Sequence, residues 1–349
     1  MDQVISSRSL NSPASPPPLR LLAVTRKPDS PSFQHRVLDY IEPLRPYGID
    51  VTWEALPADS AGRRRLRGRM ADFDGVWWHK FMLSPLGAGR WRKAARRIVY
   101  DFDDPVMYST HPGAFLPHLT RRVKFACFLR RCDAALAASE YLAQHARRYC
   151  RQVFLHPMAV EMPPAIPDRA ARSEPIRLLW MGSRPTLRFL RQVLPAIERL
   201  GPRKDVVLRV LAHEPVTSNV LHVEYRPWSP QEQEAALRES DIGLCPMPDT
   251  PWTRGKCPFK TLQYMAWGLP WVGSAVGENV QAAGPEGAAQ QRGVCVADDR
   301  QWPTALERLI GDADLRRRMG VQGRLHVERN HDLGVLSRRL AEILREIIT

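Results

Sequence analysis

The sequence has 349 residues, 44% apolar and 25% charged, which supplies two globular domains and excludes a disordered chain. No apolar run approaches the roughly 18 residues that span a bilayer, and the six cysteines show no C-x-x-C pair, so we expect reduced thiols in a cytosolic protein. The formal net charge of +14 favours anionic partners: nucleic acid, lipid headgroups or a phosphorylated substrate.

The positive charge is concentrated in the first half of the chain. Residues 1–160 hold 25 basic and 14 acidic side chains, a net charge of +11, whereas residues 161–349 carry only +3. Basic runs at 63–69 and 90–97 account for much of this excess, and Trp91 lies within the second run. A basic run that contains an aromatic residue suits a helix at a membrane surface. The alternative is that these arginines only cover solvated faces.

The first half of the chain predicts one α/β domain at 19–160, preceded by a Ser/Pro-rich disordered tail at 1–18. Short apolar runs alternate with amphipathic stretches, a pattern typical of a parallel sheet that is covered on both faces. The predicted strands are 19–25, 49–54, 75–79, 97–102, 133–138 and 153–156. The predicted helices are 33–46, 86–96, 118–131 and 140–149.

A proline-rich linker at 161–175 separates this domain from a second one at 176–330. The second domain repeats the alternation, and we expect a last amphipathic helix at 331–349 to pack back on the first domain. The predicted strands are 176–181, 206–212, 221–225, 242–246, 271–275 and 293–297. The predicted helices are 186–200, 230–240, 258–267, 301–310 and 312–329. The expected fold class is therefore α/β, with two doubly wound, Rossmann-like domains facing a cleft.

The segment 240–279 has the order expected of a ligand-binding loop at a sheet edge. A strand ends at Pro246, a polar loop follows, and a helix begins near Pro258, where proline is tolerated because its missing N–H would be unpaired. The free amides of that helix start, with Lys256 and Lys260 nearby, predict an anion site. The alternative is an ordinary loop whose lysines face water.

Motifs in both halves of the chain are similar to those of one enzyme family. The sequence reads Q-Y-M-A-W-G-L-P-W-V at 263–272, C-D-A through S-E-Y-L at 132–142 and W-M-G-S at 180–183. Their order and spacing resemble those of the GT-B glycosyltransferases of family 4, over residues 19–349. This resemblance implies transfer of a sugar from a nucleoside-diphosphate donor with retention of configuration.

The resemblance also implies which residues bind the donor. Gln263 replaces a glutamate that holds the ribose hydroxyls, and glutamine can share that task because it donates and accepts hydrogen bonds. Gly255 replaces a glutamate that contacts the donor sugar, so Lys256 or Asp249 would have to rearrange the site. The predicted donor site comprises Gly182, Ser183, Arg184, Lys256, Lys260 and Gln263.

On the acceptor side, Asp103 follows a predicted strand where family members often carry a histidine. Three interpretations of this aspartate stay open: a cleft residue, a cap on the turn, or one half of a D-x-D metal site with Asp101. We expect the first, because the basic donor site would duplicate the role of a metal. The acceptor side is predicted to include Arg36, His79, Asp104 and His111.

These observations predict a hexosyltransferase-like enzyme that needs no metal or cofactor. Asp103, Arg184, Lys256 and Lys260 would be catalytic, and closure of the domains would exclude water. The expected acceptor is a glycan or a lipid-linked glycan in polysaccharide or envelope assembly, at the inner, anionic membrane surface. Two alternatives remain: a non-catalytic GT-B-like protein that binds a nucleotide sugar or a partner, and a nucleic-acid-binding protein. The second is disfavoured because no DNA- or RNA-binding motif appears in the sequence, so no nucleic acid is expected.

Overall fold

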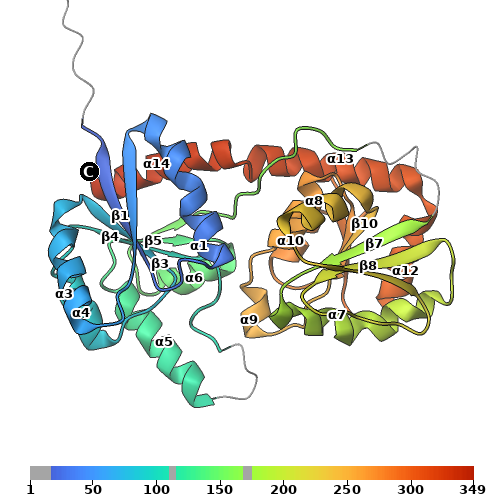
Figure 1. Ribbon diagram of the computed structural model, residues 1–349, viewed down its shortest axis with the longest axis horizontal. Coiled ribbons are helices and arrows are strands. Elements are labelled where there is room, and N and C mark those ends of the chain that lie inside the picture. Colours follow the sequence, from blue (N-terminus) through green and yellow to red (C-terminus); the bar gives the residue numbers. More distant parts are fainter. Residues whose placement is uncertain (1–16, 110–114, 168–174) are drawn as a thin grey trace, which may run out of the picture.

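The computed structural model describes residues 17–109, 115–167 and 175–349, which form two α/β domains side by side (Figure 1). Each domain contains one six-stranded sheet in which every strand pairing is parallel. Two doubly wound sheets in series confirm the predicted fold class.

The sheet of the N-terminal domain has the strand order β2-β1-β3-β4-β5-β6. Its central strands are buried along their whole length, as their continuous apolar sequences require. The strands are β1 (Leu19–Thr25), β2 (Ile49–Ala55), β3 (Gly75–His79), β4 (Ile98–Phe102), β5 (Ala134–Ala137) and β6 (Gln152–Leu155). Their carboxyl ends meet at one edge, so the loops that follow them form one side of the cleft.

Helices cover both faces of this sheet. One face packs against α3 (Ser60–Arg69), α4 (Pro85–Arg92), α5 (Phe115–Leu129) and α6 (Glu140–Arg147). The other face packs against α1 (Pro31–Arg36), α2 (Ile41–Leu44) and the last helix of the chain, α14 (Leu333–Ile348). Helix α14 buries Leu336, Leu340 and Leu344 against this domain, since residues four apart lie on one helix face.

Two predictions for this domain are wrong. The single helix predicted at 33–46 is divided into α1, α2 and two 3-10 turns. The first break lies at Val37, whose φ of −130° is not helical, and Pro43 and Pro46 lack the N–H groups that would continue a helix beyond it. Helix α3 was not predicted at all. It buries only Gly62 and Leu66, so its apolar stripe is too narrow to give a clear helical period, although Asp59 caps its first turn.

The sheet of the C-terminal domain has the strand order β12-β11-β10-β7-β8-β9. The strands are β7 (Ile176–Met181), β8 (Val206–Ala212), β9 (His222–Pro227), β10 (Ile242–Cys245), β11 (Trp271–Ser274) and β12 (Gly293–Val296). One face packs against α7 (Arg184–Ile197) and α12 (Gln301–Gly311). The other packs against α8 (Pro230–Glu239), α10 (Phe259–Ala266), α11 (Glu278–Ala283) and α13 (Ala313–Asn330). The short helices α9 (Pro251–Arg254) and α11 were not predicted.

The chain crosses between the domains twice, and the two crossings lie side by side. The first runs from the end of β6 through Val160, and the second is the turn between α13 and α14. The Val160 amide donates to the His331 carbonyl at 2.9 Å, and a parallel bridge joins Val160 to Asp332. Figure 1 shows α13 along one domain and α14 along the other. None of the described helices is both long and apolar enough to cross a membrane.

Candidate functional site

The two domains touch through the loops at the carboxyl edges of their sheets. The His35 ring lies 4.6 Å from the Phe259 ring, between their centroids, and the Tyr141 hydroxyl donates to the Pro251 carbonyl at 3.2 Å. Burial raises the pKa of the Cys257 thiol, and the nearby carboxylates of Asp103 and Asp104 raise it further. The loop before α10 therefore lies close to the loop after β4, and these two loops face one another across the cleft.

On the C-terminal side, Lys260 lies in the first turn of α10 and reaches the end of β7. Its Nζ is 4.4 Å from the centroid of the Trp180 ring and 3.4 Å from Thr186 Oγ1. A Cβ atom at Gly182 would lie 2.5 Å from that Nζ, so only glycine leaves room for the ammonium group. The structure thus brings the predicted donor residues Gly182 and Lys260 together.

The Lys260 ammonium has no carboxylate within ion-pair distance among the described residues. Burial lowers the pKa of Lys260 to about 8, and repulsion from Lys256 acts in the same direction. A lysine at a helix start is opposed by the helix dipole. This position is therefore electrostatically suited to an anion that approaches the carboxyl edge of the sheet.

The other predicted donor residues differ in their exposure and in their contacts. Lys256 lies in the loop before α10, with its Nζ 4.7 Å from the centroid of the Trp252 ring, and Gln263 is half-buried on α10. Ser183 is the N-cap of α7. Arg184 follows it with 76% of its side chain exposed, and its guanidinium forms an ion pair with Glu214. The geometry thus groups Lys260 with Gly182, whereas Arg184 is held by a carboxylate of its own domain.

Gly255, where the resembling family has a glutamate, packs against the N-terminal domain. A Cβ atom here would lie 2.7 Å from Cδ1 of Tyr141 and 3.1 Å from a methyl carbon of Leu142. The Tyr141 ring therefore occupies the space that a larger side chain would need. Glycine at this position allows helix α6 to approach the loop between α9 and α10.

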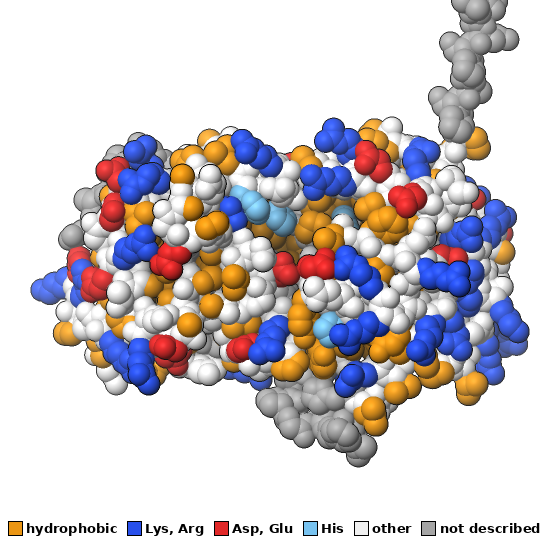
Figure 2. Space-filling view, turned by 180° about the vertical axis from the view of Figure 1, so that it is seen from behind, with side chains coloured by type: hydrophobic (Ala, Val, Ile, Leu, Met, Phe, Trp, Pro, Cys, Tyr) orange, Lys and Arg blue, Asp and Glu red, His pale blue; other side chains and the backbone are white. Residues whose placement is uncertain are grey.

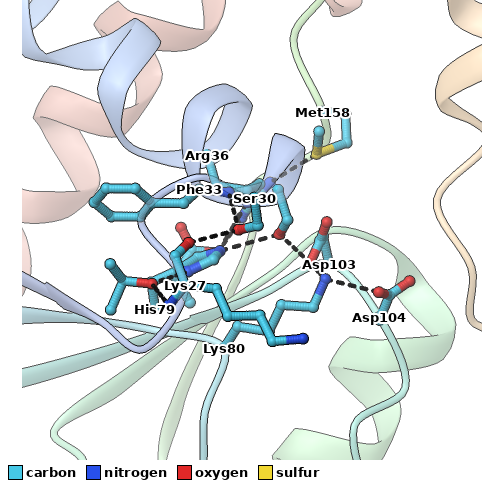
Figure 3. Close-up of polar contacts among 12 residues, drawn as sticks. Lys27, Ser30, Phe33, Arg36, His79, Lys80, Asp103, Asp104 and Met158 are labelled. Atoms are coloured by element: carbon cyan, nitrogen blue, oxygen red, sulfur yellow. Dashed lines mark hydrogen bonds and ion pairs between the residues drawn. The ribbon is translucent and has the colours of Figure 1, made fainter. Parts of the chain in front are cut away.

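On the N-terminal side, Lys80 lies between two carboxylates (Figure 3). Its Nζ is 2.7 Å from Asp103 Oδ1 and 2.7 Å from Asp104 Oδ2. Burial opposes ionisation of Asp103, but the Lys80 ammonium holds the pKa of this carboxyl well below its usual range. Asp103 is thus ionised, and Lys80 holds both side chains in place at the edge of the cleft.

The backbone of Lys80 is strained. Its φ of 64° lies in the left-handed region, and it is the one non-glycine residue with positive φ in the described part of the chain. Its amide donates to the Asp101 carbonyl at 2.7 Å, and its carbonyl accepts from the Tyr100 hydroxyl at 2.9 Å. Such strain persists only where the surroundings fix it, and it is concentrated at functional sites.

A chain of hydrogen bonds connects Asp103 to the protein interior. Ser32 Oγ donates to Asp103 Oδ1 at 2.8 Å and lies 3.0 Å from His79 Nε2, while His79 Nδ1 lies 3.2 Å from Thr25 Oγ1. Burial lowers the pKa of His79 to about 3, so the ring is neutral. With Ser32 donating to Asp103, the His79 Nε2–H donates to Ser32, and Thr25 donates to Nδ1.

Two residues predicted on the acceptor side are corrected by this geometry. His79 is only 2% exposed, so it orients Ser32 from below and does not face an acceptor. Arg36 is fully buried, where its Nε donates to Asp101 Oδ1 at 2.9 Å and its Nη1 donates to the carbonyls of His156 and Pro157. Both residues therefore stabilise the domain instead of binding ligand, because their polar atoms are already paired inside it.

The D-x-D interpretation of Asp101 and Asp103 is not favoured by their partners. Asp101 also accepts from Trp77 Nε1 at 2.9 Å, and Asp103 is paired with Lys80. Within the described residues, no group of three or more His, Cys, Asp or Glu side chains is placed to hold a metal ion. The predicted acceptor residue His111 lies outside the described residues.

Sequence reasoning missed Lys80, Ser32 and Tyr141. No motif marks Lys80, since a lysine after a strand is common, and its importance follows from its two carboxylate partners and its φ. Ser32 lies in the first turn of a helix capped by Ser30, and no motif of the sequence marks it. The glycine at 255 was the one available signal for Tyr141.

The comparisons with known proteins agree with this architecture. Residues 164–312 match the family model described as glycosyl transferases group 1. The protein has the GT-B fold, and the segment that matches this family model lies mostly in its C-terminal domain. A comparison with curated proteins finds no match. The predicted class of nucleotide-sugar glycosyltransferase is confirmed, whereas membership of family 4 and retention stay predictions.

Solved structures share the GT-B fold over nearly the whole chain at low sequence identity. Sucrose-phosphate synthase from Thermosynechococcus elongatus has a TM-score of 0.70 and 16% identity, covering 94% of this chain and 99% of that one. HepE from Anabaena, in complex with UDP and glucose, has a TM-score of 0.65 and 11% identity, covering 94% and 100%. A UDP-forming α,α-trehalose-phosphate synthase from Burkholderia xenovorans has a TM-score of 0.66 and 14% identity, covering 95% and 100%.

The contact at Gly255 gives a first prediction. Gly255→Glu, which restores the residue of the resembling family, should lower the free energy of unfolding by about 1–3 kcal/mol, because the new side chain overlaps the Tyr141 ring. Urea denaturation measures this change. The double variant Gly255→Glu/Tyr141→Ala should lose less stability than the two single changes added together. A Gly255→Glu protein as stable as the wild type would show that the domains are apart in solution.

The Lys80 contacts give a second prediction. Lys80→Ala and Lys80→Gly both remove the ammonium, so the pKa of Asp103 should rise and the acid limb of the kcat/KM profile should move to higher pH. Lys80→Gly should be the more stable of the two by about 1 kcal/mol, because only glycine adopts positive φ without strain. Lys80→Arg keeps the charge and serves as the control. Superimposable pH profiles in all four proteins would exclude this role for Lys80.

Proposed function

We propose that the protein transfers a sugar from a nucleoside-diphosphate donor to a hydroxyl group of a glycan or lipid-linked acceptor, with retention of configuration. The single observation that carries the proposal is the Lys260 ammonium, which lies at the start of α10 without a carboxylate partner among the described residues. A diphosphate supplies the negative charge that this position lacks.

The proposed chemistry uses this charge to stabilise the leaving group. When the bond between the sugar and the diphosphate breaks, negative charge grows on the phosphate oxygen and positive charge grows on the sugar. Lys260 and the first amides of α10 stabilise the phosphate, with Lys256 in the adjoining loop. In this proposal Gln263, on the same helix, holds the ribose. The proton of the acceptor hydroxyl passes to the departing diphosphate.

The opposite wall of the cleft supplies the complementary charge. Asp103 is ionised, and the Lys80 ammonium contacts both Asp103 and Asp104, so this one ammonium is shared between two acidic side chains. A carboxylate beside the reacting carbon stabilises the positive charge on the sugar. Contacts across the cleft, such as the one between His35 and Phe259, support a closed state that excludes water from the donor.

The proposed setting is the cytoplasmic face of a membrane, in polysaccharide or envelope glycan assembly. The net charge of +11 on residues 1–160 supports attraction to anionic lipid headgroups there. UDP is the first nucleotide to test, since HepE is described in complex with UDP and glucose, and the Burkholderia xenovorans synthase is described as UDP-forming.

A second candidate function rests on Gly255. Because this glycine takes the place of a glutamate that contacts the donor sugar, the protein could bind a nucleotide sugar without transferring it. Measurement of free nucleoside diphosphate released from a panel of donors, with and without a membrane extract as the acceptor source, distinguishes the two. Donor binding without release in either condition would favour the binding protein.

Lys260→Ala tests the donor site directly. The variant should keep its fold, and the free protein should be no less stable, because a buried ammonium and its unfavourable position at the helix start are both removed. Donor binding and turnover should weaken by about 2–4 kcal/mol in the transition state. Isothermal titration with UDP and the steady-state rate of diphosphate release measure the two effects.

Lys204→Ala is the matched control, since Lys204 is an exposed lysine of the same domain that precedes β8 at the opposite edge of the sheet. In the wild type, UDP affinity should also fall as the pH rises above about 8, where Lys260 of the free protein loses its proton. This loss should be absent in Lys260→Ala. Wild-type affinity and turnover in Lys260→Ala would refute the assignment of the donor site.

Metal independence is a further prediction. Lys260, Lys256 and the amides of α10 supply positive charge at the diphosphate, so EDTA should leave the rate of sugar transfer unchanged. The assay compares enzyme treated with EDTA before and after addition of manganese. Loss of activity in EDTA with recovery in manganese would contradict the prediction and would favour a metal site at Asp101 and Asp103.

A further inference from the structure

Three neighbouring helices on one face of the N-terminal domain contain no acidic residue. Helices α3, α4 and α5 pack on the same face of the sheet, and α4 contacts both of its neighbours. Their sequences together hold ten basic residues and no Asp or Glu. These residues are Arg63, Arg64, Arg65, Arg67, Arg69, Arg90, Arg92, Arg121, Arg122 and Lys124. We call this surface the basic face.

The charge on the basic face is largely uncompensated. Arg69 and Arg92 form ion pairs with Glu54 and Asp133, but Arg64, Arg65 and Arg90 are exposed and have no carboxylate within ion-pair distance among the described residues. Arginines four apart on α3 repel one another. Figure 2 shows many Lys and Arg side chains at the end of the molecule that the N-terminal domain forms. The charges of Arg64, Arg65 and Arg90 are therefore available to an anionic partner.

Large apolar side chains are exposed on the same helices. Leu86 is 85% exposed on the first turn of α4, and Leu119 and Val123 are 50% and 47% exposed on α5. Arg90 follows Leu86 by four residues and Arg122 follows Leu119 by three, and both arginines are exposed as well. Exposure of leucine and valine side chains to water is unfavourable. Apolar side chains exposed beside arginines are typical of a surface that enters a lipid interface.

A single partner that binds both the basic and the apolar residues must itself be both anionic and apolar. Trp91, which the sequence suggested as the membrane-facing aromatic residue, is only 4% exposed and lies beneath the Arg67 guanidinium. It is therefore unable to insert into lipid, and Leu86 takes that place. The buried Trp91 also argues against nucleic acid, because no aromatic ring of α4 is free to stack on a base.

We propose that the basic face is a docking surface for an anionic lipid bilayer, with Leu86, Leu119 and Val123 entering the headgroup region and the arginines of α3 and α4 binding lipid phosphates. The proposal deepens the proposed function, on which its biological purpose rests. Its physical basis is independent, because the basic face lies outside the donor site. The partner is recognised by charge complementarity together with insertion of apolar side chains.

The basic face also lies next to the acceptor side of the cleft. Arg121 Nη1 donates to the Val106 carbonyl at 3.4 Å, and the Val106 amide donates to the Asp104 carbonyl at 2.7 Å. Asp104 in turn pairs with Lys80. A protein docked by α4 and α5 therefore holds the loop after β4 near the lipid surface, where a lipid-linked acceptor would present its hydroxyl group.

The test compares vesicle binding of two variants with equal changes in charge. One is Arg64→Gln/Arg65→Gln/Arg90→Gln on the basic face, and the matched control is Arg199→Gln/Arg317→Gln/Arg318→Gln on exposed positions of the C-terminal domain. Sedimentation uses phosphatidylglycerol/phosphatidylcholine vesicles and pure phosphatidylcholine vesicles over a salt series. Each arginine at an anionic surface contributes about fivefold to the partition coefficient, so the first variant should bind about a hundredfold more weakly and the control close to wild type.

A third variant, Leu86→Ser, separates insertion from charge attraction. It should weaken binding to anionic vesicles several-fold without changing the dependence on salt, because it removes an apolar contact and no charge. UDP affinity should be unchanged in all three variants, which shows that they are folded and that any failure of docking is distinct from failure of the donor site. Wild-type binding by the basic-face variant would overturn the proposal. Equal binding to neutral vesicles, or binding of RNA without binding of vesicles, would also overturn it.

Discussion

The buried ion pair between Arg36 and Asp101 determines how the N-terminal wall of the cleft is built. Arg36 lies on α1, Asp101 on β4, and the same guanidinium binds the carbonyls of His156 and Pro157, where the chain leaves the domain. A charge in the interior is stable only when it is paired, and removal of one partner of such a pair costs about 3–5 kcal/mol. The pair therefore joins a helix, a central strand and the first crossing between the domains.

The site residues depend on this arrangement. Because Arg36 holds α1 against β4, Ser32 on the first turn of α1 meets Asp103 just beyond the end of β4. Because β3 and β4 are neighbours, the strained Lys80 is brought to the same carboxylate. The N-terminal wall of the cleft is thus a rigid set of charges, supported from below by the neutral His79.

The C-terminal wall is organised by close approach of neighbouring elements at two glycines. Gly182 leaves room for the Lys260 ammonium, and Gly255 leaves room for Tyr141 of the other domain. In both places the absence of a side chain allows two elements to meet. The contact at Gly182 shapes a position for an anion. The contact at Gly255 joins the two domains, as do the paired crossings at Val160 and His331.

The sequence alone determined the fold class, most strand positions and the position of Lys260 at a helix start, because continuous apolar strands and proline at a helix boundary are local signals. It also indicated a glycosyltransferase through the order of its motifs. Only the tertiary structure showed that Arg36 and His79 are buried, that Lys80 holds Asp103, and that α3, α4 and α5 form one basic face. Those facts depend on which distant residues become neighbours, and the burial and pairing of a charged side chain follow from its neighbours and not from its own position in the chain.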